Sequence, residues 1–218
     1  MADTTDKYSY IGENNHEGQP HGKGTMHYHG VKYTGQWQDG VMHGKGNLTF
    51  EDGGVYDGDW QYGKKHGIGT LRYSNGSVFK GHWEEGQMEG WGVLTAADGE
   101  TLYNGQWHQG KKHGRGINYF ASYRYEGDFI DNKMHGSGIL YSLNGERFEG
   151  TFVDNDMHIG IMYFPDGSRI DGEWKNGNIN GCMVTADGKR TELSGLPQKN
   201  SSVQDNSTAQ ILAQLCKI

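Results

Sequence analysis

Histidine recurs along this 218-residue chain at a nearly constant spacing, a pattern that could support chemistry. Six of the eleven histidines occupy equivalent positions of a repeated motif: His21, His43, His66, His113, His135 and His158. Regularly spaced imidazoles could bind metal ions or pass protons. Equivalent positions lie about 10 Å apart if each motif supplies two neighbouring strands, whereas zinc binds an imidazole nitrogen at about 2 Å. One ion therefore cannot be shared between motifs. We expect structural turn histidines that hydrogen-bond the backbone, and no metal site.

Other residue types that often carry chemistry lack the context that their chemistry needs. Runs such as Gly44-Lys45-Gly46 resemble phosphate-binding loops, but they lack the Gly-Lys-Ser/Thr ending and a following helix. Cys182 has no partner base nearby in the sequence. Pairs of carboxylates occur without an acid–base motif and are expected to line a solvated rim: Asp57, Asp59, Glu84, Glu85, Asp128, Asp131, Asp154 and Asp156. The sequence predicts no catalytic residue, no cofactor-binding residue and no enzyme activity.

The glycines, aromatic residues and histidines belong to a tandem repeat. The run YTGQWQDGVMHGKG from Tyr33 returns from Tyr56 and from Tyr103, and in a looser form from Phe79. Further copies open at Tyr10, Tyr125, Phe148 and Ile170, which makes eight. A fixed period of about 23 residues indicates a repeat array. The first copy is atypical because Asn14 stands where tryptophan is expected, as is common in a terminal repeat.

The elements that position these residues are predicted from their alternation. Tyr33, Gly35 and Trp37 fall on one face of a strand, and the residues between them fall on the other. Each repeat therefore reads as a β-hairpin, with turns at dipeptides such as Asp39-Gly40 and Asp52-Gly53. Large rings are expected to lie over bare glycines on the neighbouring strand. The residues with this structural role are Tyr33, Trp37, His43, Tyr56, Trp60, His66, Trp83, Tyr103, Trp107 and His113.

Composition narrows the class of protein. Glycine accounts for 37 residues, hydrophobic residues for 33%, and the net charge is −7. A negative charge disfavours general nucleic-acid binding and strong attraction to anionic membranes. The cysteines, Cys182 and Cys216, stand far apart in unlike contexts and favour a reducing cytoplasm over a disulfide framework.

The pattern at Tyr33–Gly46, Tyr56–Gly69 and Tyr103–Gly116 resembles the MORN repeat. The resemblance implies an all-β fold, an elongated single-layer twisted antiparallel sheet of tandem β-hairpins. We predict a flexible N-terminus (1–9), a repeat array (10–190), a polar linker (191–207) and a short amphipathic C-terminal helix (208–218). The helix is expected either to cap the end of the sheet or to dock on a partner.

The variable positions of the repeat predict where partners bind. A methionine often precedes the turn histidine or its substitute, which gives an intermittent apolar stripe of Met42, Met88, Met134 and Met157. Trp91 and Ile68 stand between the two glycines of their repeats and are expected to face away from the rings. In the predicted helix, Ile211, Leu212 and Leu215 have helical spacing. Local packing is the alternative explanation for the methionine stripe.

Two classes of function follow. The first is a non-catalytic scaffold for protein–protein interaction in the cytoplasm. By resemblance this would be a cytoskeletal or ciliary component, such as the radial spoke head of the axoneme, with other spoke-head subunits or a second copy as partners. The second is a phosphoinositide or membrane-surface adaptor, for which Lys64, Lys65, Lys111, Lys112 and Arg115 are the basic candidates. Regulation of an enzyme held by another chain is a third option.

Overall fold

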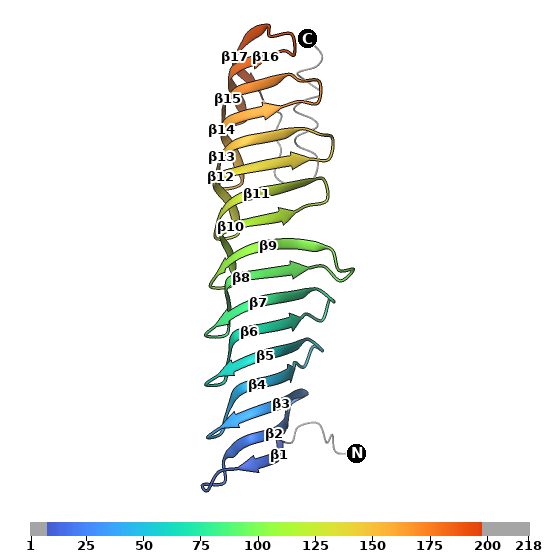
Figure 1. The fold of residues 1–218 in the computed structure, drawn as a ribbon, viewed down its shortest axis with the longest axis vertical. Coiled ribbons are helices and arrows are strands. Elements are labelled where there is room, and N and C mark those ends of the chain that lie inside the picture. The colour runs from blue at the N-terminus through green and yellow to red at the C-terminus, as the bar shows by residue number, and fades with distance from the viewer. Residues whose placement is uncertain (1–7, 198–218) are drawn as a thin grey trace. The chain divides into compact units, whose positions relative to one another are not determined.

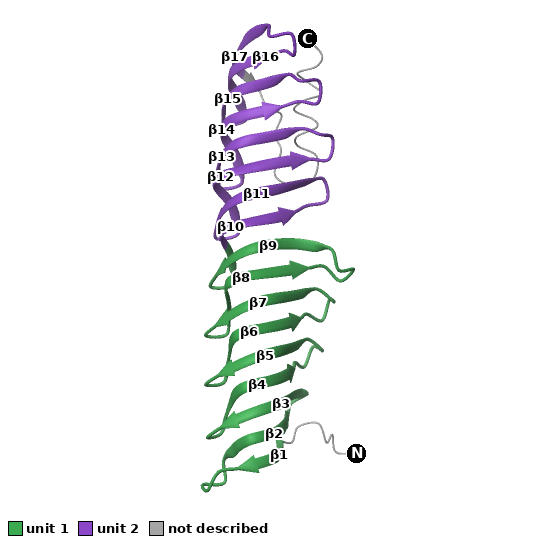
Figure 2. Ribbon diagram, viewed as in Figure 1, with its two compact units in different colours: residues 1–112 green, residues 113–218 purple. Residues whose placement is uncertain are grey.

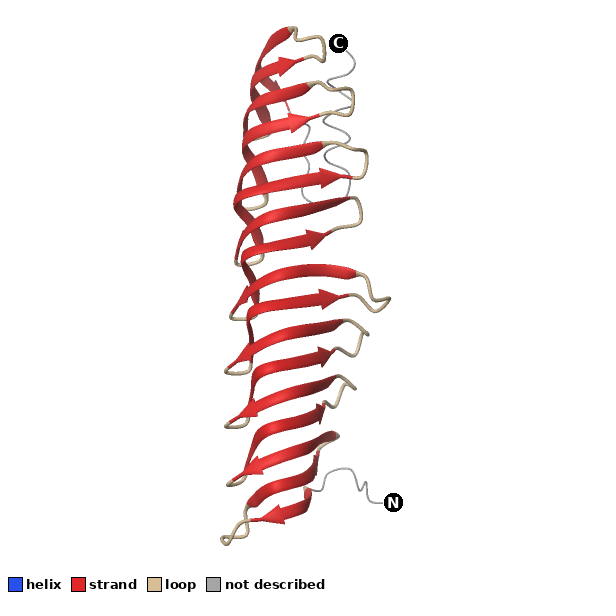
Figure 3. Ribbon diagram, in the orientation of Figure 1, coloured by secondary structure: helices blue, strands red, loops and turns tan. Residues whose placement is uncertain are grey.

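The computed structural model describes residues 8–197, which form β-strands and turns without a helix (Figures 1 and 3). Contacts divide the chain into two units, residues 1–112 and 113–218 (Figure 2). The predicted C-terminal helix, with Ile211, Leu212 and Leu215, lies outside the described residues, as does most of the N-terminal segment. The all-β prediction is therefore confirmed for the repeat array.

Unit 1 is an antiparallel meander in which each strand pairs with the next one in the chain. Its strands are β1 (Ser9–Asn14), β2 (Pro20–Tyr28), β3 (Val31–Gln38), β4 (Val41–Thr49), β5 (Val55–Gln61), β6 (Lys64–Arg72), β7 (Val78–Glu84), β8 (Gln87–Thr95) and β9 (Thr101–His108).

Unit 2 repeats this arrangement. Its strands are β10 (Lys111–Tyr119), which begins in the last residues of unit 1, then β11 (Tyr123–Ile130), β12 (Lys133–Ser142), β13 (Arg147–Val153), β14 (Asp156–Tyr163), β15 (Arg169–Lys175), β16 (Asn178–Val184) and β17 (Arg190–Pro197). Each unit is thus a series of hairpins, one for each repeat.

β17 corrects part of the predicted linker. Residues 191–197 were expected to begin a polar connection, but they form a strand that pairs with β16 from Val184↔Arg190 to Asn178↔Pro197. Leu193 is 9% exposed, so this strand buries an apolar side chain. The serine and glycine in this segment do not favour a strand, so the sequence did not predict one. The strand is stabilised by its pairing with β16.

The hairpin turns have the predicted positions. Asp39 and Gly40 both have positive φ, 48° and 83°, the backbone of a two-residue turn that suits the strand twist. In β11–β12 and β13–β14 the turn glycine is replaced by Asn132 and Asn155, which also adopt positive φ. Asparagine tolerates this backbone better than other side chains. These substitutions therefore preserve the turn, although the sequence presents them as loss of the motif.

A bulge interrupts most of the hairpins, although β15–β16 has none, and alternation alone did not predict it. In β3–β4, Gly35 pairs with Gly46 but Gln36 pairs with His43, so Gly44 and Lys45 are extra residues in β4. Gly44 has a φ of 60°, which a glycine at a bulge accommodates without steric cost. The first glycine of each His-Gly-x-Gly run therefore shapes the backbone, while the second serves packing.

Rings over glycines form the core. The ring of Tyr33 lies so close to Gly46 that a Cβ added there would stand 2.5 Å from its Cε2 and Cζ atoms. The Tyr33 hydroxyl donates a hydrogen bond to the Gln36 carbonyl at 2.9 Å, and the Trp60 indole donates one to the Gly46 carbonyl at 3.1 Å. Tyr33 is 0% exposed and Trp60 is 5% exposed. The predicted packing is confirmed.

The rings of neighbouring repeats interlock edge to face. The centroid of Tyr33 lies 5.0 Å from that of Trp37 and 5.4 Å from that of Trp60. In unit 2 the same ladder continues with phenylalanines, as in the pair of Tyr125 and Phe152 at 4.8 Å. Such contacts contribute about 0.5–1.5 kcal/mol each beyond the area that they bury. Replacement of tryptophan by phenylalanine keeps the ring packing and gives up only the indole hydrogen bond.

Candidate protein-binding surface

The face opposite the rings, called here the reverse face, carries the residues that stand between the two glycines of each run. In β4–β6 the Asp59 carboxylate joins two of these positions. It accepts a hydrogen bond from the Ile68 amide at 3.0 Å and lies 2.6 Å from the Lys45 ammonium. Burial raises the pKa of Asp59, but these two bonds outweigh it and hold the pKa below the ordinary value of 3.8. Asp59 therefore closes the bulge with a charged hydrogen bond.

The same position closes other bulges with different side chains. Gln36 accepts a hydrogen bond from the Lys45 amide at 2.7 Å, and Asp128 accepts one from the Ser137 amide at 3.0 Å. In the fourth repeat this position is His82. Within residues 8–197 no side chain accepts a hydrogen bond from the Trp91 amide. The fourth repeat thus has a bulge without the polar closure that Gln36, Asp59 and Asp128 provide in other repeats.

Ile68 and Trp91 flank His82 and are both exposed, at 47% and 56%. Ile68 on β6 pairs directly with His82 on β7, and Trp91 lies in the bulge of β8 on the other side of His82. We call Ile68, His82 and Trp91 the apolar patch. The predicted orientation of Ile68 and Trp91 away from the rings is confirmed. His82 was missed, although comparison with Gln36, Asp59 and Asp128 in equivalent positions would have singled it out.

Lys80, two residues before His82 on β7, is exposed and makes no ion pair among the described residues. It pairs across the sheet with Val93 of β8, two residues beyond Trp91. A cation therefore borders the apolar patch. This surface would complement an apolar side chain that is accompanied by a carboxylate.

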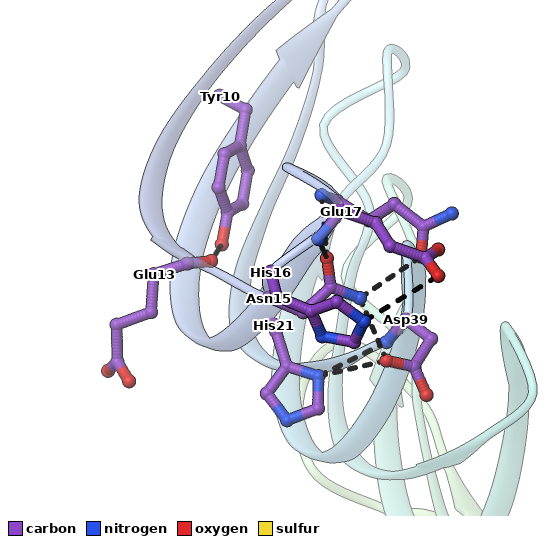
Figure 4. A network of polar contacts seen from close by, with 8 residues as sticks. Tyr10, Glu13, Asn15, His16, Glu17, His21 and Asp39 are labelled. Atoms are coloured by element: carbon purple, nitrogen blue, oxygen red, sulfur yellow. Dashed lines mark hydrogen bonds and ion pairs between the residues drawn. The ribbon is translucent and has the colours of Figure 1, made fainter.

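Two of the motif histidines, His21 and His135, connect successive hairpins. The Asp39 amide donates a hydrogen bond to Nδ1 of His21 at 3.4 Å, and the Asp154 amide donates one to Nδ1 of His135 at 3.5 Å (Figure 4 for His21). In the fourth repeat Glu89 replaces the histidine, and its carboxylate accepts a hydrogen bond from the Gln109 amide at 2.9 Å. The expected bond to the backbone is therefore present at His21 and His135, where it reaches the turn of the next repeat. At His43 the prediction was wrong, because its Nδ1 is buried and has no hydrogen-bond partner. The part of the chain that the structure describes contains no group of three His, Cys, Asp or Glu side chains able to hold a metal ion.

A separate set of side-chain hydrogen bonds holds the turn of the first hairpin (Figure 4). The side-chain oxygen of Asn15 accepts hydrogen bonds from the backbone amides of Glu17 and Gln19, both at 3.0 Å. The side-chain nitrogen of Asn15 donates a hydrogen bond to the Asp39 carboxylate at 3.0 Å. The hydrogen bond from Asn15 is the main reason that the pKa of Asp39 is lowered. The atypical sequence of the first repeat thus ties its longer turn to the second hairpin.

The methionine stripe lies on the ring face rather than on the reverse face. Met42 and Met88 pair directly with Trp37 and Trp83 and are partly buried, as is Met157. Met134 is only 4% exposed, which corrects the expectation that it belongs to an accessible stripe. Its side chain packs in the core, so a contact role remains a prediction only for Met42, Met88 and Met157.

The basic candidates for lipid binding are already engaged. Lys64 pairs with Glu85, and the Lys65 ammonium lies 4.2 Å from the centroid of the Trp83 ring. Lys112 lies over the Tyr103 ring at 5.1 Å, and Arg115 pairs with Asp128 at 3.3 Å. Burial lowers the pKa of both Lys65 and Lys112. These side chains therefore serve packing and ion pairs.

One shallow hollow of about 580 Å³ lies on the reverse face of β2–β4. It is lined by Lys23, Gly24, Thr25, Thr34, Gly35, Gln36 and Lys45. Within residues 8–197 there is no helix long and apolar enough to cross a membrane.

The solved structures that match this chain have very different sequences. The TCP10 domain of Danio rerio CPAP is 14% identical, with a TM-score of 0.41 and coverage of 84% of this chain and 94% of that one. The TCP domain of Drosophila melanogaster SAS-4, in complex with a proline-rich motif of Ana2, is 8% identical, with a TM-score of 0.34 and coverage of 89% and 94%. No curated protein matches this chain significantly.

The family model for the MORN repeat matches eight segments that together span most of the chain. They are residues 16–29, 33–55, 56–78, 79–101, 103–122, 125–147, 148–169 and 171–182. Their number agrees with the eight copies read from the sequence, and each of the six complete ones begins at an aromatic residue of the ring ladder. The chain therefore belongs to the MORN-repeat family.

Proposed function

We propose that this protein is a non-catalytic scaffold that binds other proteins through the reverse face of unit 1, with the apolar patch as its central contact. The observation that carries this proposal is Trp91, which is 56% exposed and replaces the lysine or arginine of other repeats. Four core tryptophans, Trp37, Trp60, Trp83 and Trp107, donate indole hydrogen bonds to glycine carbonyls, and Trp91 takes no part in that ladder.

Packing energetics favours a role for Trp91 in recognition. Exposure of a tryptophan leaves a large apolar area in water, at a cost of about 25 cal/mol per Å² relative to burial. Tryptophan is also among the residues that most often dominate a protein interface, where truncation costs about 2 kcal/mol or more. The neighbouring Ile68 and the unpaired Lys80 extend the contact with one apolar and one charged group.

The setting we propose is a cytoskeletal or ciliary assembly in the cytoplasm, such as the radial spoke head of the axoneme. Family resemblance supports this setting, and the partners would be other subunits of that assembly. The engagement of Lys64, Lys65, Lys112 and Arg115 with acidic or aromatic side chains weighs against the alternative of a phosphoinositide adaptor.

The test uses the full chain with Trp91→Ala and with the control Ile11→Ser, which changes an exposed residue of the same unit far from the patch (Ile11 is 78% exposed). Each protein is bound to extracted axonemes or cytoskeletons, and retained subunits are identified and titrated. We expect wild type and Ile11→Ser to retain the same subunits, and Trp91→Ala to bind them roughly thirtyfold more weakly. Equal binding by all three proteins would refute the patch. Binding to phosphatidylinositol bisphosphate vesicles at physiological salt, without retention of protein, would refute the scaffold.

A further inference from the structure

The reverse face of unit 2 carries two parallel rows of side chains. The first, called the Arg–Tyr row, alternates along consecutive strands: Tyr119, Arg124, Tyr141, Arg147, Tyr163 and Arg169. The second, called the acid–Ile row, lies two residues away along each strand: Ile117, Glu126, Ile139, Glu149, Ile161 and Asp171. Two residues correspond to about 6.6 Å along a strand, so the rows are adjacent.

Two of the three arginines lie over tyrosine rings of the same row. The guanidinium of Arg124 lies 4.4 Å from the centroid of the Tyr141 ring, and that of Arg147 lies 4.6 Å from the centroid of Tyr163. Each also approaches the carboxylate on its own strand, as Arg147 does with Glu149 at 3.1 Å. About two-fifths of each arginine side chain remains exposed: 42% for Arg124, 41% for Arg147 and 42% for Arg169. An arginine has five N–H donors, so one carboxylate neighbour leaves others available.

The repeat fold does not require these rows. Unit 1 has the same kind of strands and ring ladder, but its equivalent pairs are Ser9 and Ile11, Lys32 and Thr34, Val55 and Asp57, Val78 and Lys80, and Leu102 and Asn104. None of them places an arginine two residues before a carboxylate. The rows are therefore an addition to unit 2. Arginine and tyrosine, which dominate one of them, are enriched where proteins associate.

The charge pattern identifies the occupant. The rows contain three arginines and three carboxylates, so the surface has no net charge and does not complement a partner of one sign. It does complement itself. Rotation by 180° about an axis that runs along the rows, midway between them, sets the Arg–Tyr row of one copy against the acid–Ile row of another. Each arginine then faces a carboxylate, and the arrangement closes as an isologous dimer.

We propose that unit 2 forms a homodimer through these two rows, with Arg147 of one protomer opposite Glu149 of its partner. The proposal is independent of the apolar patch, which lies in unit 1. Exposed charge pairs across such an interface weaken with salt because they are screened over about 8–10 Å. Tyrosine rings and isoleucines between the charges supply the apolar contact.

The test is a charge-reversal experiment on the full chain by sedimentation equilibrium at low and high salt. The acidic variant carries Arg147→Glu and Arg169→Glu, and the basic variant carries Glu149→Arg and Asp171→Arg. The control Lys133→Glu reverses one member of an exposed ion pair with Asp154 (Nζ–Oδ1 3.2 Å), outside both rows. We expect wild type and the control to dimerise. Each charge variant should dimerise roughly thirtyfold more weakly or worse.

The decisive sample is an equimolar mixture of the acidic and basic variants. Rotation about the proposed axis sets each reversed row against a row of opposite charge, so the mixture should form heterodimers although neither variant dimerises alone. A monomeric wild type, or a mixture that stays monomeric, would overturn the proposal. If circular dichroism reveals that a variant does not fold, Arg147→Gln and Glu149→Gln replace it, and unchanged dimerisation of both would count against the rows. Subunit binding through Trp91 is measured in parallel and should be unaffected.

Discussion

Replacement of Gly46 with alanine tests the packing of rings over glycines. In a regular strand this substitution would stabilise the protein by about 0.5–1 kcal/mol, because glycine loses more backbone entropy on folding. Here the added methyl group would stand 2.2 Å from the hydroxyl oxygen of Tyr33 and 2.5 Å from two of its ring carbons. The ring cannot move aside freely, because it is 0% exposed and lies between Trp37 and Trp60. The sign of the effect should therefore reverse.

The magnitude follows from two losses. Overpacking of a tight core costs about 1–3 kcal/mol. Displacement of the Tyr33 hydroxyl from the Gln36 carbonyl, now 2.9 Å away, costs about 0.5–1.5 kcal/mol more. The gain of about 0.5–1 kcal/mol in backbone entropy offsets part of these losses, so we expect Gly46→Ala to lower the free energy of unfolding by about 1–3.5 kcal/mol. Urea unfolding followed by tryptophan fluorescence measures it.

A double-mutant cycle separates the clash from other effects. Tyr33→Leu removes the part of the ring that Gly46→Ala would strike, so the two changes together should cost at least about 1 kcal/mol less than their sum. The control is Gly63→Ala, a turn glycine with no atom within 4 Å of the added Cβ. It should cost about 1–2 kcal/mol from its positive φ and show no coupling to Tyr33→Leu. Additivity of Gly46→Ala and Tyr33→Leu would refute the reasoning.

The remaining predictions concern two charged groups. Lys65→Met should stabilise the protein by about 0.5–1 kcal/mol, because burial lowers the pKa of Lys65 and methionine occupies the equivalent positions 42 and 88; a lower thermal midpoint would mean that its contact with Trp83 outweighs desolvation. Asp59→Asn should make the free energy of unfolding depend less on pH in the acid range. The pKa of Asp59 is lowered in the fold, so its contribution is complete above about pH 5 and is lost as the pH falls through the folded pKa, below 3.8. Urea midpoints from neutral pH to pH 2 compare the two proteins, and parallel curves would contradict the role of the carboxylate.

The parts of the fold that follow from the two-residue alternation of strands and from the spacing of the repeats could be predicted from the sequence. Alternation placed Tyr33 and Trp37 on the buried face and Trp91 on the exposed one, and turn dipeptides located the hairpins. The bulge could not be read in this way, because two extra residues leave the alternation unchanged on both sides of it. Only the register shift between Gly35 and Gln36, together with the positive φ of Gly44, reveals it.

The candidate surfaces needed contacts that are far apart in the sequence. Met134 looked like its counterpart Met88, but it is 4% exposed. The Arg–Tyr row is a property of five strand pairings, and no single repeat contains it. Arg124-Tyr125-Glu126 in isolation reads as an ordinary alternating strand.

One face of the sheet stabilises the fold and the other is mostly free to vary, which explains why the repeat sequence can change without loss of the fold. The ring ladder and its hydrogen bonds to backbone carbonyls use only the motif positions, so phenylalanine at 129 and 152 or asparagine at 132 and 155 changes little. On the reverse face, the structural contact that recurs from repeat to repeat is the closure of the bulge, as Asp59 provides it. Where His82 replaces that closure, the neighbouring position accepts Trp91. Selection for binding can therefore act on the reverse face at a cost limited to one hydrogen bond, about 0.5–1.5 kcal/mol. Recognition in this array should then lie where the bulge closure is broken or where a row of side chains departs from the motif.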